Sequence, residues 1–205
     1  MNITLDNISK RYTSNWILRN VNYEFSEDHV YAIKGDNGSG KSTLLKMISG
    51  LLSPSVGSIN YQDVDKKISN EEVYRHVSYW GPYVSLLKNL SVVEMISYYI
   101  KNKPLRNTQS VLEIFHNMNV NVSPKSIAKS LSSGQIQRVG LYLTILSDSS
   151  ILLLDEPGSY LDQEGKNWYQ ELLKREQSNR IVIIASNEEG DMRLADKSLT
   201  ISDFH

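Results

Sequence analysis

The chain has 205 residues, and 40% of them are hydrophobic. This length and apolar share are typical of one packed globular domain, and they exclude a disordered or collagen-like protein. The formal net charge of −1 is not that of a protein that tracks nucleic-acid phosphates, so no nucleic-acid partner is expected. The absence of cysteine excludes disulfides, thiolate metal sites and cysteine nucleophiles.

The first residues, 1–7, contain no basic stretch followed by an apolar core. We therefore expect no secretory signal and a mature chain that begins at Met1. The apolar runs are far shorter than the roughly 18 residues that a membrane-spanning helix needs. Any role at a membrane is expected to depend on a partner.

Apolar side chains alternate near the N-terminus. Ile3 and Leu5, and later Val21 and Tyr23, stand at every second position, which is typical of half-buried strands. The pattern predicts an antiparallel β region at the start of the chain.

A strand, a glycine-rich loop and a helix are predicted next. The β-prone run 30–34 stops at Gly35, and a helical apolar spacing follows until Ser53 and Pro54 end it. The predicted apolar face of this helix is formed by Leu44, Leu45, Ile48, Leu51 and Leu52.

Helical spacing dominates from about residue 85 to residue 134, where strand signals are scarce. Ser91 and Glu94 fit a capping box that opens one of these helices. We expect the stretch 85–134 to be a helical subdomain inserted into a single domain that spans residues 1–205.

Two short apolar runs, 151–154 and 181–184, are of the kind that buried parallel strands show. A helical stretch around 168–173 separates them, and Leu199 and Ile201 alternate as in a last strand. These elements predict an α/β fold with a mostly parallel core sheet.

The segment from Gly35 to Thr43 carries the spacing G-x-x-x-x-G-K-[ST] between the predicted strand and helix. Its glycines let the backbone wrap a phosphate with N–H groups, and the positive end of the helix dipole begins there. We expect Lys41 to reach the β- and γ-phosphates of a nucleotide, and the hydroxyl of Ser42 to coordinate Mg²⁺. The residues of this candidate nucleotide site are Gly35, Asp36, Asn37, Gly38, Ser39, Gly40, Lys41, Ser42 and Thr43.

Two carboxylates, Asp155 and Glu156, stand at the carboxyl end of the apolar run 151–154. Ligands of open α/β sheets bind at that edge. Taken alone, such an acidic pair can also be a helix start, but in a chain with a phosphate loop it predicts chemistry on phosphates. Asp155 can hold the metal, and Glu156 can polarise a water in line with the γ-phosphate.

A third motif, Leu131-Ser132-Ser133-Gly134-Gln135, stands before the acidic strand. One interpretation is structural, because Ser132 and Gln135 have the spacing of a capping box. The pentad also resembles the LSGGQ signature of ABC-type ATPases. The order of phosphate loop, helical insertion, signature and acidic strand is the order of that family. Over essentially its full length, the chain therefore resembles the ATP-binding subunit of an ABC transporter, which implies a P-loop NTPase core.

The resemblance implies that two ATPase subunits dimerise head to tail, as a homodimer or a heterodimer. Each ATP would lie between the phosphate loop of one subunit and the signature of the other. Ser132, Gly134 and Gln135 would then contact nucleotide on the opposite subunit, with Ser133 in place of a usual glycine. Asp162, in a stretch that looks like the D-loop, would lie at the dimer interface.

Three further assignments follow from the resemblance. Tyr12 occupies the place of the aromatic residue on which adenine stacks, with Trp16 as its rival. Pro82 stands where the family usually has a glutamine that touches Mg²⁺ and the membrane partner. Ser186 or Asn187 stands where the family usually has a histidine that donates to the γ-phosphate. The Asn187 amide can donate a hydrogen bond but has no charge at neutral pH, so slow hydrolysis is expected.

The resemblance implies an ATP-hydrolysing subunit, with ATP and Mg²⁺ as cofactors. It would power a separate membrane permease from a cytoplasmic position, peripheral on the inner face of the cell membrane. Trp80, Tyr83, Leu86 and Leu87 lie where the family receives the permease, although such apolar side chains can equally be buried core.

Two other functions stay open at this stage. The first is a regulatory subunit with slow or no turnover, suggested by Pro82 and by the missing histidine. The second is an ABC protein that acts on nucleic acid or ribosomes, which the near-zero net charge disfavours. The sequence indicates neither the transported substrate nor the direction of transport, because in this family the permease largely sets the substrate.

Overall fold

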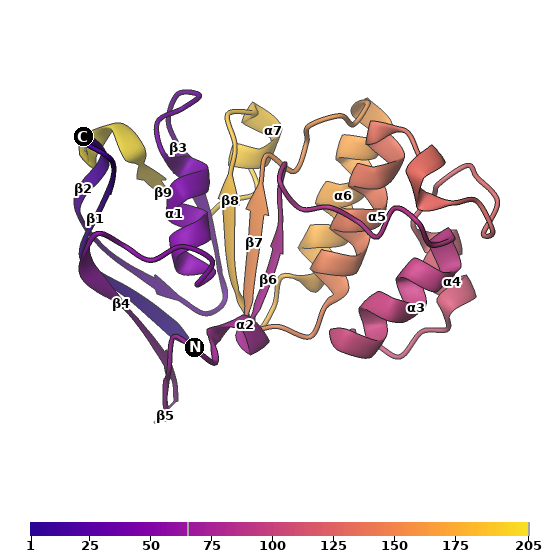
Figure 1. Cartoon of the computed structure of the whole chain (residues 1–205), viewed down its shortest axis with the longest axis horizontal. Helices are drawn as coiled ribbons and strands as arrows, with labels where there is room; N and C mark the ends of the chain where they lie inside the picture. The colour runs from indigo at the N-terminus through magenta and orange to yellow at the C-terminus, as the bar shows by residue number, and fades with distance from the viewer. Residues whose placement is uncertain (65, 205) are drawn as a thin grey trace. The chain divides into compact units, whose positions relative to one another are not determined.

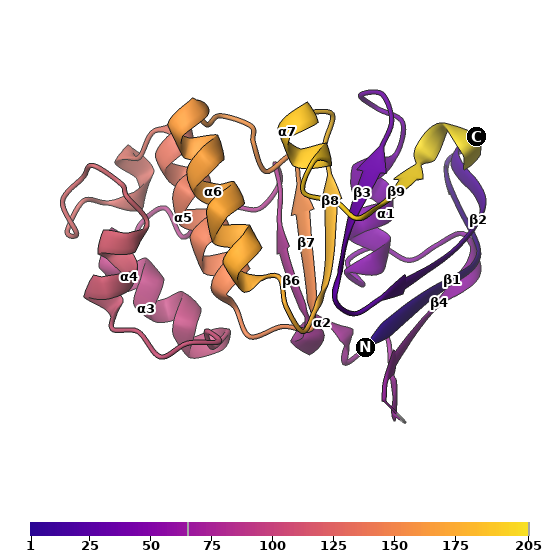
Figure 2. The ribbon, with the colours of Figure 1, turned by 180° about the vertical axis from the view of Figure 1, so that it is seen from behind.

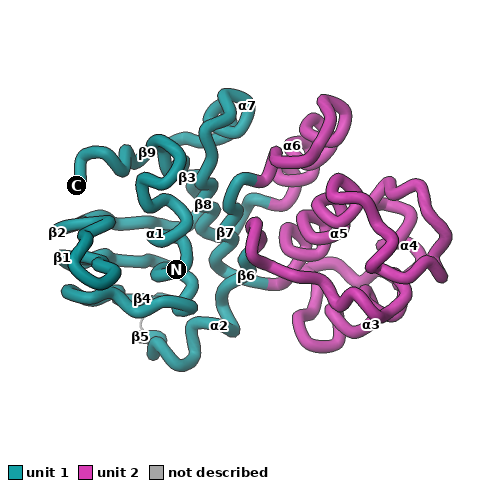
Figure 3. The backbone as a smooth tube through the Cα atoms, turned by 45° about the horizontal axis from the view of Figure 1, so that its top comes forward, with its two compact units in different colours: residues 1–79, 149–156, 177–205 teal, residues 80–148, 157–176 magenta. Residues whose placement is uncertain are grey.

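The computed structural model describes residues 1–64 and 66–204. The chain divides into two compact units, shown in Figure 3. The first unit comprises Met1–Tyr79, Ser149–Glu156 and Gln177–His205. The second unit comprises Trp80–Asp148 and Pro157–Glu176. The predicted helical subdomain, 85–134, lies inside the second unit, while the assignment of residues 1–205 to one domain stays a prediction.

The N-terminal region forms an antiparallel sheet, as the alternating apolar side chains predict. Its strand order is β2 (Asn15–Ser26), β1 (Asn2–Tyr12), β4 (Val56–Asp63) and β5 (Lys66–Ile68). Strand β1 pairs antiparallel with both β2 and β4. The alternating residues Ile3, Leu5 and Val21 are buried and belong to the core of the first unit.

A second sheet carries the strands that lead into the candidate site (Figure 1). Its order is β6 (Val77–Trp80), β7 (Ile151–Asp155), β8 (Ile181–Ala185), β3 (His29–Lys34) and β9 (Lys197–Thr200). Strand β8 pairs in parallel with β7 and β3, and β3 pairs in parallel with β9. Every residue of β7 and β8 is buried, which explains their uninterrupted apolar sequences.

The carboxyl ends of three neighbouring strands meet at one edge of this sheet. Asp155 pairs with Ala185 in the register, and Ala185 pairs with Ile33. The segments that follow β3, β7 and β8 therefore leave the sheet side by side. These segments are the phosphate loop, the chain after Asp155, and the stretch that begins at Ser186.

Helix α1 (Lys41–Ile48) follows the phosphate loop and ends earlier than the apolar spacing predicts. The chain leaves the helix at Gly50, whose φ of 78° is the left-handed conformation that closes many helices. Leu51 is consequently 70% exposed, so its predicted place on the buried face is wrong. The other helical segments of the first unit are short: α2 (Val73–His76), α7 (Glu189–Met192) and the 3₁₀ turn η2 (Ile201–Phe204). Ile201 thus lies just after β9 rather than within it.

The second unit is helical, as the spacing in this part of the chain predicts. Its elements are α3 (Val92–Asn102), α4 (Val111–Asn117), the 3₁₀ turn η1 (Ala128–Ser130), α5 (Ser133–Leu146) and α6 (Gln163–Glu176). Helices α5 and α6 pack side by side (Figure 2). Ser91 and Glu94 form the predicted capping box at the start of α3.

Within the second unit, Trp80 packs directly on the backbone of α5. A Cβ atom added to Gly140 would lie 2.1 Å from ring atoms of Trp80, so only glycine permits this approach. The indole Nε1 donates to Gln137 Oε1 at 3.0 Å, and Gln137 Nε2 donates to the carbonyl of Pro157 at 2.8 Å. The buried polar groups of Trp80 and Gln137 are thereby satisfied.

Gly140→Ala is expected to destabilise the protein by about 1–3 kcal/mol, because the added methyl group overpacks the contact with the indole ring. Urea denaturation, followed by circular dichroism, measures the loss. In a Trp80→Leu background the smaller side chain leaves room for the methyl group, so the same substitution should cost less. An equal cost in both backgrounds would contradict the contact.

Candidate phosphate-binding and metal site

The phosphate loop owes its curvature to glycine. Gly38 and Gly40 have φ values of 84° and 104°, a conformation that side chains rarely adopt. A Cβ atom at Gly40 would also lie 2.8 Å from the side chain of Ile17. Ser39 Oγ, on the same loop, is buried and has no hydrogen-bond partner among the described residues. An oxygen atom of a ligand bound at the loop would accept a hydrogen bond from this hydroxyl. A phosphate group supplies such oxygen atoms.

Lys41 lies at the start of α1 with its ammonium group inside the curve of the loop. Its side chain is 6% exposed, and Nζ donates to the carbonyls of Gly35 at 2.7 Å and Asp36 at 3.2 Å. Nζ also lies 3.8 Å from Glu156 Oε1. A buried ammonium group beside the glycine-rich loop suits an anion, and the carbonyl contacts hold this group in place.

Asp155 ends β7 and accepts hydrogen bonds on both carboxylate oxygens. Ser42 Oγ donates to Oδ1 at 2.9 Å, and the Tyr79 hydroxyl donates to Oδ2 at 3.1 Å. Asp155 is 1% exposed, and burial raises the pKa of its carboxyl, while the bonds from Ser42 and Tyr79 oppose that rise. The structure therefore brings together the two predicted metal ligands, Ser42 and Asp155.

These oxygen ligands fit a magnesium ion only in combination with a nucleotide. No group of three or more histidine, aspartate or glutamate side chains in the described chain is placed to hold a metal. Mg²⁺ is usually bound through one or two protein oxygens together with phosphate oxygens and water. The Ser42 hydroxyl and the Asp155 carboxylate are oxygen groups of the kind that make up such a protein share.

Glu156 follows directly and has an unusual backbone. Its φ of 51° is left-handed, and its N–H donates to the carbonyl of Ala185 at 2.7 Å. Strained conformations of this kind cost roughly 1–3 kcal/mol and cluster at functional sites. Burial raises the pKa of the Glu156 carboxyl, Lys41 opposes this, and the charges of Asp155 and Glu188 add to it. A raised pKa makes Glu156 a stronger proton acceptor, as a general base requires.

Two adjacent residues were candidates for the position after β8, and the structure separates them. Ser186 is 1% exposed, and its Oγ accepts a hydrogen bond from the N–H of Glu188. Asn187 is exposed, and its Nδ2 donates to Asn37 Oδ1 on the phosphate loop at 2.9 Å. Asn187 is therefore the side chain that reaches the loop.

The signature residues lie in the second unit, at the start of α5. Ser132 Oγ accepts from the N–H of Gln135, and the Gln135 side chain accepts from the N–H of Ser132, which forms a complete capping box. A groove of about 360 Å³ opens beside them. It is lined by Ser132, Ser133, Gly134, Gln135, Arg138, Tyr160, Leu161 and Asp162. The structural interpretation of the pentad is thus correct, and the groove leaves room for a ligand as well.

Asp162 is one of the residues that line this groove. Its Oδ1 accepts from the N–H of Gly165 at 2.8 Å and lies 3.6 Å from Nη2 of Arg138. The guanidinium group of Arg138 lies over the ring of Trp168, 5.3 Å from its centroid. The Asp162 side chain is nevertheless 75% exposed, as an interface residue of the predicted dimer would be.

The two aromatic candidates for adenine stacking lie at the turn between β1 and β2. Tyr12 is 50% exposed, with Lys10 Nζ 5.4 Å from its ring centroid. Trp16 has two guanidinium groups, those of Arg11 and Arg19, each 5.5 Å from its ring. Tyr12 therefore has the less crowded ring, and its role in stacking stays a prediction.

The predicted permease-facing residues differ in burial. Trp80 is 3% exposed and is core, which agrees with the structural alternative for this residue. Tyr83 and Leu87 are 77% and 43% exposed, and Leu86 is partly buried. Pro82, which is exposed, brings no side-chain oxygen to the site. No helix in the described ranges is both long enough and apolar enough to cross a membrane.

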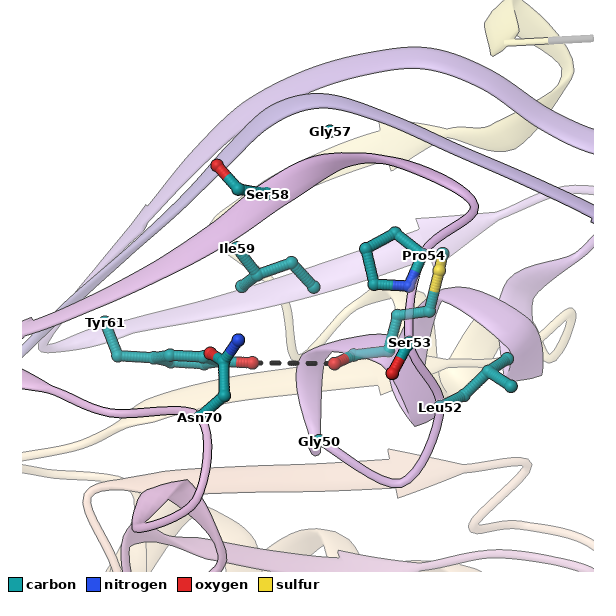
Figure 4. Close-up of a pocket in the computed structure, with 10 residues that line it drawn as sticks. Gly50, Leu52, Ser53, Pro54, Gly57, Ser58, Ile59, Tyr61 and Asn70 are labelled. Atoms are coloured by element: carbon teal, nitrogen blue, oxygen red, sulfur yellow. Dashed lines mark hydrogen bonds between the residues drawn. The ribbon is translucent and has the colours of Figure 1, made fainter.

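A separate cavity of about 140 Å³ lies in the first unit, between the end of α1 and β4 (Figure 4). None of the described residues that line it carries a formal charge. The hydroxyl of Tyr61 at this cavity donates to the carbonyls of Ile48 at 2.8 Å and Met47 at 3.5 Å. The polar group of Tyr61 is therefore bonded to carbonyl groups in the last turn of α1. The residues that line the cavity do not include those of the phosphate loop.

The comparisons with known proteins agree with this geometry. A family model described as "ABC transporter" matches residues 18–159. The chain is 29% identical to the ergothioneine transport ATP-binding protein EgtV of Helicobacter pylori, over 97% of this chain and 96% of that protein. It is also 29% identical to the ribose import ATP-binding protein RbsA of Streptococcus agalactiae, over 96% of this chain but only 42% of that protein.

Among solved structures, the dimeric ATP-binding cassette MJ0796, bound to ADP and Pi in a post-hydrolysis state, has a similar fold. The TM-score is 0.79 at 22% identity, and the match covers 97% of this chain and 93% of that chain. This likeness agrees with the predicted α/β fold, in which a mostly parallel sheet is combined with an antiparallel one.

Replacing Glu156 by glutamine should stabilise the nucleotide-free protein, because the neutral amide avoids the cost of burying a charge. The pKa of Glu156 is higher in the folded protein than its value of about 4.5 in the unfolded chain. As pH rises through this interval, Glu156 loses its proton less readily in the folded state, and the folded state of the parent protein is destabilised. The gain in melting temperature of Glu156→Gln over the parent should therefore grow with pH and then level off. Thermal melts from about pH 4.5 to pH 7.5 test this. Glu24→Gln, at an exposed position on β2, is the control for the change from a carboxylate to an amide away from the site.

Proposed function

The chain belongs to the ABC transporter family as one of its ATP-binding, ATP-hydrolysing subunits, and we propose that it uses Mg-ATP to power a separate membrane permease. One observation carries the proposal: Lys41 and Ser42, at the end of the glycine-rich loop, contact Glu156 and Asp155, which come from a distant part of the chain. Phosphoryl transfer relies on such positioning and on charge stabilisation more than on covalent chemistry.

Each of these residues has a proposed task. The glycine-rich loop and Lys41 bind the β- and γ-phosphates. Ser42 and Asp155 hold Mg²⁺, which when bound neutralises charge on the phosphates. Glu156 orients a water molecule and accepts its proton, and the raised pKa of its carboxyl supports this role.

The subunit acts as a dimer in this proposal. The groove at Ser132, Gly134 and Gln135 would receive ATP bound to the phosphate loop of a second ATPase subunit, either a copy of this chain or a different one. Tyr12 would stack on the adenine. ATP binding would favour the closed dimer and hydrolysis would favour the open one. The resulting shift between the closed and open states would drive the permease.

The permease is the proposed membrane partner, and the subunit would lie on the inner face of the cell membrane. Tyr83 and Leu87 are exposed apolar side chains of the segment after β6, and they support a contact there. We treat residues 1–205 as one nucleotide-binding domain in which the second unit carries both the signature and this contact.

A second candidate is a subunit with slow turnover and a regulatory role. It is favoured by Asn187, a neutral amide that contacts the phosphate loop at the position where the family usually has a histidine. A lost donor to developing charge costs roughly 10²–10³ in rate at comparable sites. Retention of Lys41, Asp155 and Glu156 favours hydrolysis over pure binding.

Two variants test the proposed function. Lys41→Ala should abolish binding of ATP, and Glu156→Gln should retain binding but lose turnover by at least about 10²-fold, since the general base is gone. Equilibrium binding of a fluorescent ATP analogue and phosphate release, measured alone and with the co-purified membrane partner, give both numbers. Tight ATP binding by Lys41→Ala, or unchanged turnover in Glu156→Gln, would contradict the assignment.

Asn187→His should raise the rate of hydrolysis by roughly tenfold or more, because the imidazole adds a donor that can carry positive charge near the γ-phosphate. Single-turnover phosphate release with ATP in excess of its dissociation constant measures the chemical step. Asn187→Ala, which adds no donor, should not raise the rate. An equal rate in Asn187→His and the parent would show that the amide is not what slows the site.

A further inference from the structure

Strand β6 presents a hydroxyl group to the buried carboxylate at the end of β7. The ring of Tyr79 packs against the hydrophobic core of the first unit. Its hydroxyl donates to Asp155 Oδ2 at 3.1 Å. Since the ring is held by packing, the hydroxyl is fixed without further loss of side-chain freedom on binding.

The two hydrogen bonds to Asp155 differ in what happens to them when a metal binds. Ser42 Oγ, which donates to Oδ1, is itself a predicted Mg²⁺ ligand, so its geometry changes with the metal. Tyr79 is not one of the predicted metal ligands, so its bond to Oδ2 does not have to change when a metal binds. A donor on Oδ2 restricts the rotation of the carboxylate and so orients Oδ1.

Pro82, three residues after Tyr79, stands where the resemblance implies a metal-contacting glutamine, and proline has no side-chain oxygen. We propose that Tyr79 is a positioning residue that acts through Asp155, and that its hydroxyl sets the affinity of this site for Mg²⁺ in the presence of ATP. The inference rests on the proposed function, because it needs Mg-ATP to bind at the phosphate loop.

The size of the effect follows from known outer-shell groups. Removing a hydrogen-bond partner of a metal-ligating side chain typically weakens metal affinity by 10–100-fold. Tyr79→Phe removes the hydroxyl and keeps the ring in the core. The half-saturating Mg²⁺ concentration should therefore rise by roughly tenfold or more, while binding of ATP without metal stays within about twofold.

The experiment uses the Glu156→Gln protein, so that hydrolysis does not interfere. ATP binding is measured by calorimetry in EDTA and then as a function of free Mg²⁺, and Mn²⁺ binding in the presence of ATP is followed by electron paramagnetic resonance. Tyr142→Phe is the matched control, because the Tyr142 hydroxyl also bonds to a side-chain oxygen, that of Gln109, at 3.0 Å. Melting temperatures establish that both variants are folded.

The outcomes separate the inference from the function on which it rests. Support is a weakened Mg²⁺ and Mn²⁺ affinity in Tyr79→Phe with unchanged metal-free ATP affinity, and no change in Tyr142→Phe. Equal metal affinity in Tyr79→Phe and its parent overturns the role of Tyr79 and leaves the proposed function standing. A parent protein that binds no ATP in either condition overturns both.

Discussion

The hydrogen bond between Ser42 and Asp155 is the contact on which the site depends. It joins residues 113 positions apart, one at the start of α1 and one at the end of β7. A buried carboxylate is tolerated only with hydrogen-bond donors or positive charge around it, and Asp155 has Ser42, Tyr79 and the nearby charges of Lys46 and Lys41. A one-residue slip of β7 against β8 would turn Asp155 to the other face of the sheet, so the register of the sheet is tied to the site.

Much of this could be predicted, because the signals are local. The phosphate loop, the capping box at Ser91 and the alternation in β1 depend on neighbours in sequence. Tyr79 could not be found that way, since its partner lies on a strand that adjoins β6 only in the folded sheet. The burial of Trp80 could not be predicted from neighbouring residues either, because its ring packs on α5 at Gly140, a residue without a side chain. The early end of α1 could also be predicted from the sequence, because glycine residues such as Gly50 commonly end helices.

The pentad Leu131–Gln135 has an observed structural role, and this role is compatible with the proposed functional one. Ser132 and Gln135 satisfy each other's backbone N–H groups and so fix the first turn of α5, and residues of this turn line the groove. Gly134 cannot be replaced without a shift, because a Cβ atom there would lie 2.9 Å from the carbonyl oxygen of Tyr160. Ser133 is exposed and meets no such constraint, which explains why this departure from the family pattern is tolerated.

The missing histidine changes the balance of charge around Glu156. A cationic imidazole nearby would lower the pKa of this carboxyl through its charge, whereas Asn187 lowers the pKa only through a backbone hydrogen bond, and the charge of Glu188 raises it. Glu156 thereby remains the more basic acceptor for a proton, and in the proposed mechanism the charge on the phosphates is met by Lys41, the loop and the proposed metal. In the proposed mechanism the site is therefore better equipped to activate water than to stabilise the charge on the phosphates, because Glu156 has a raised pKa and Asn187 carries no charge.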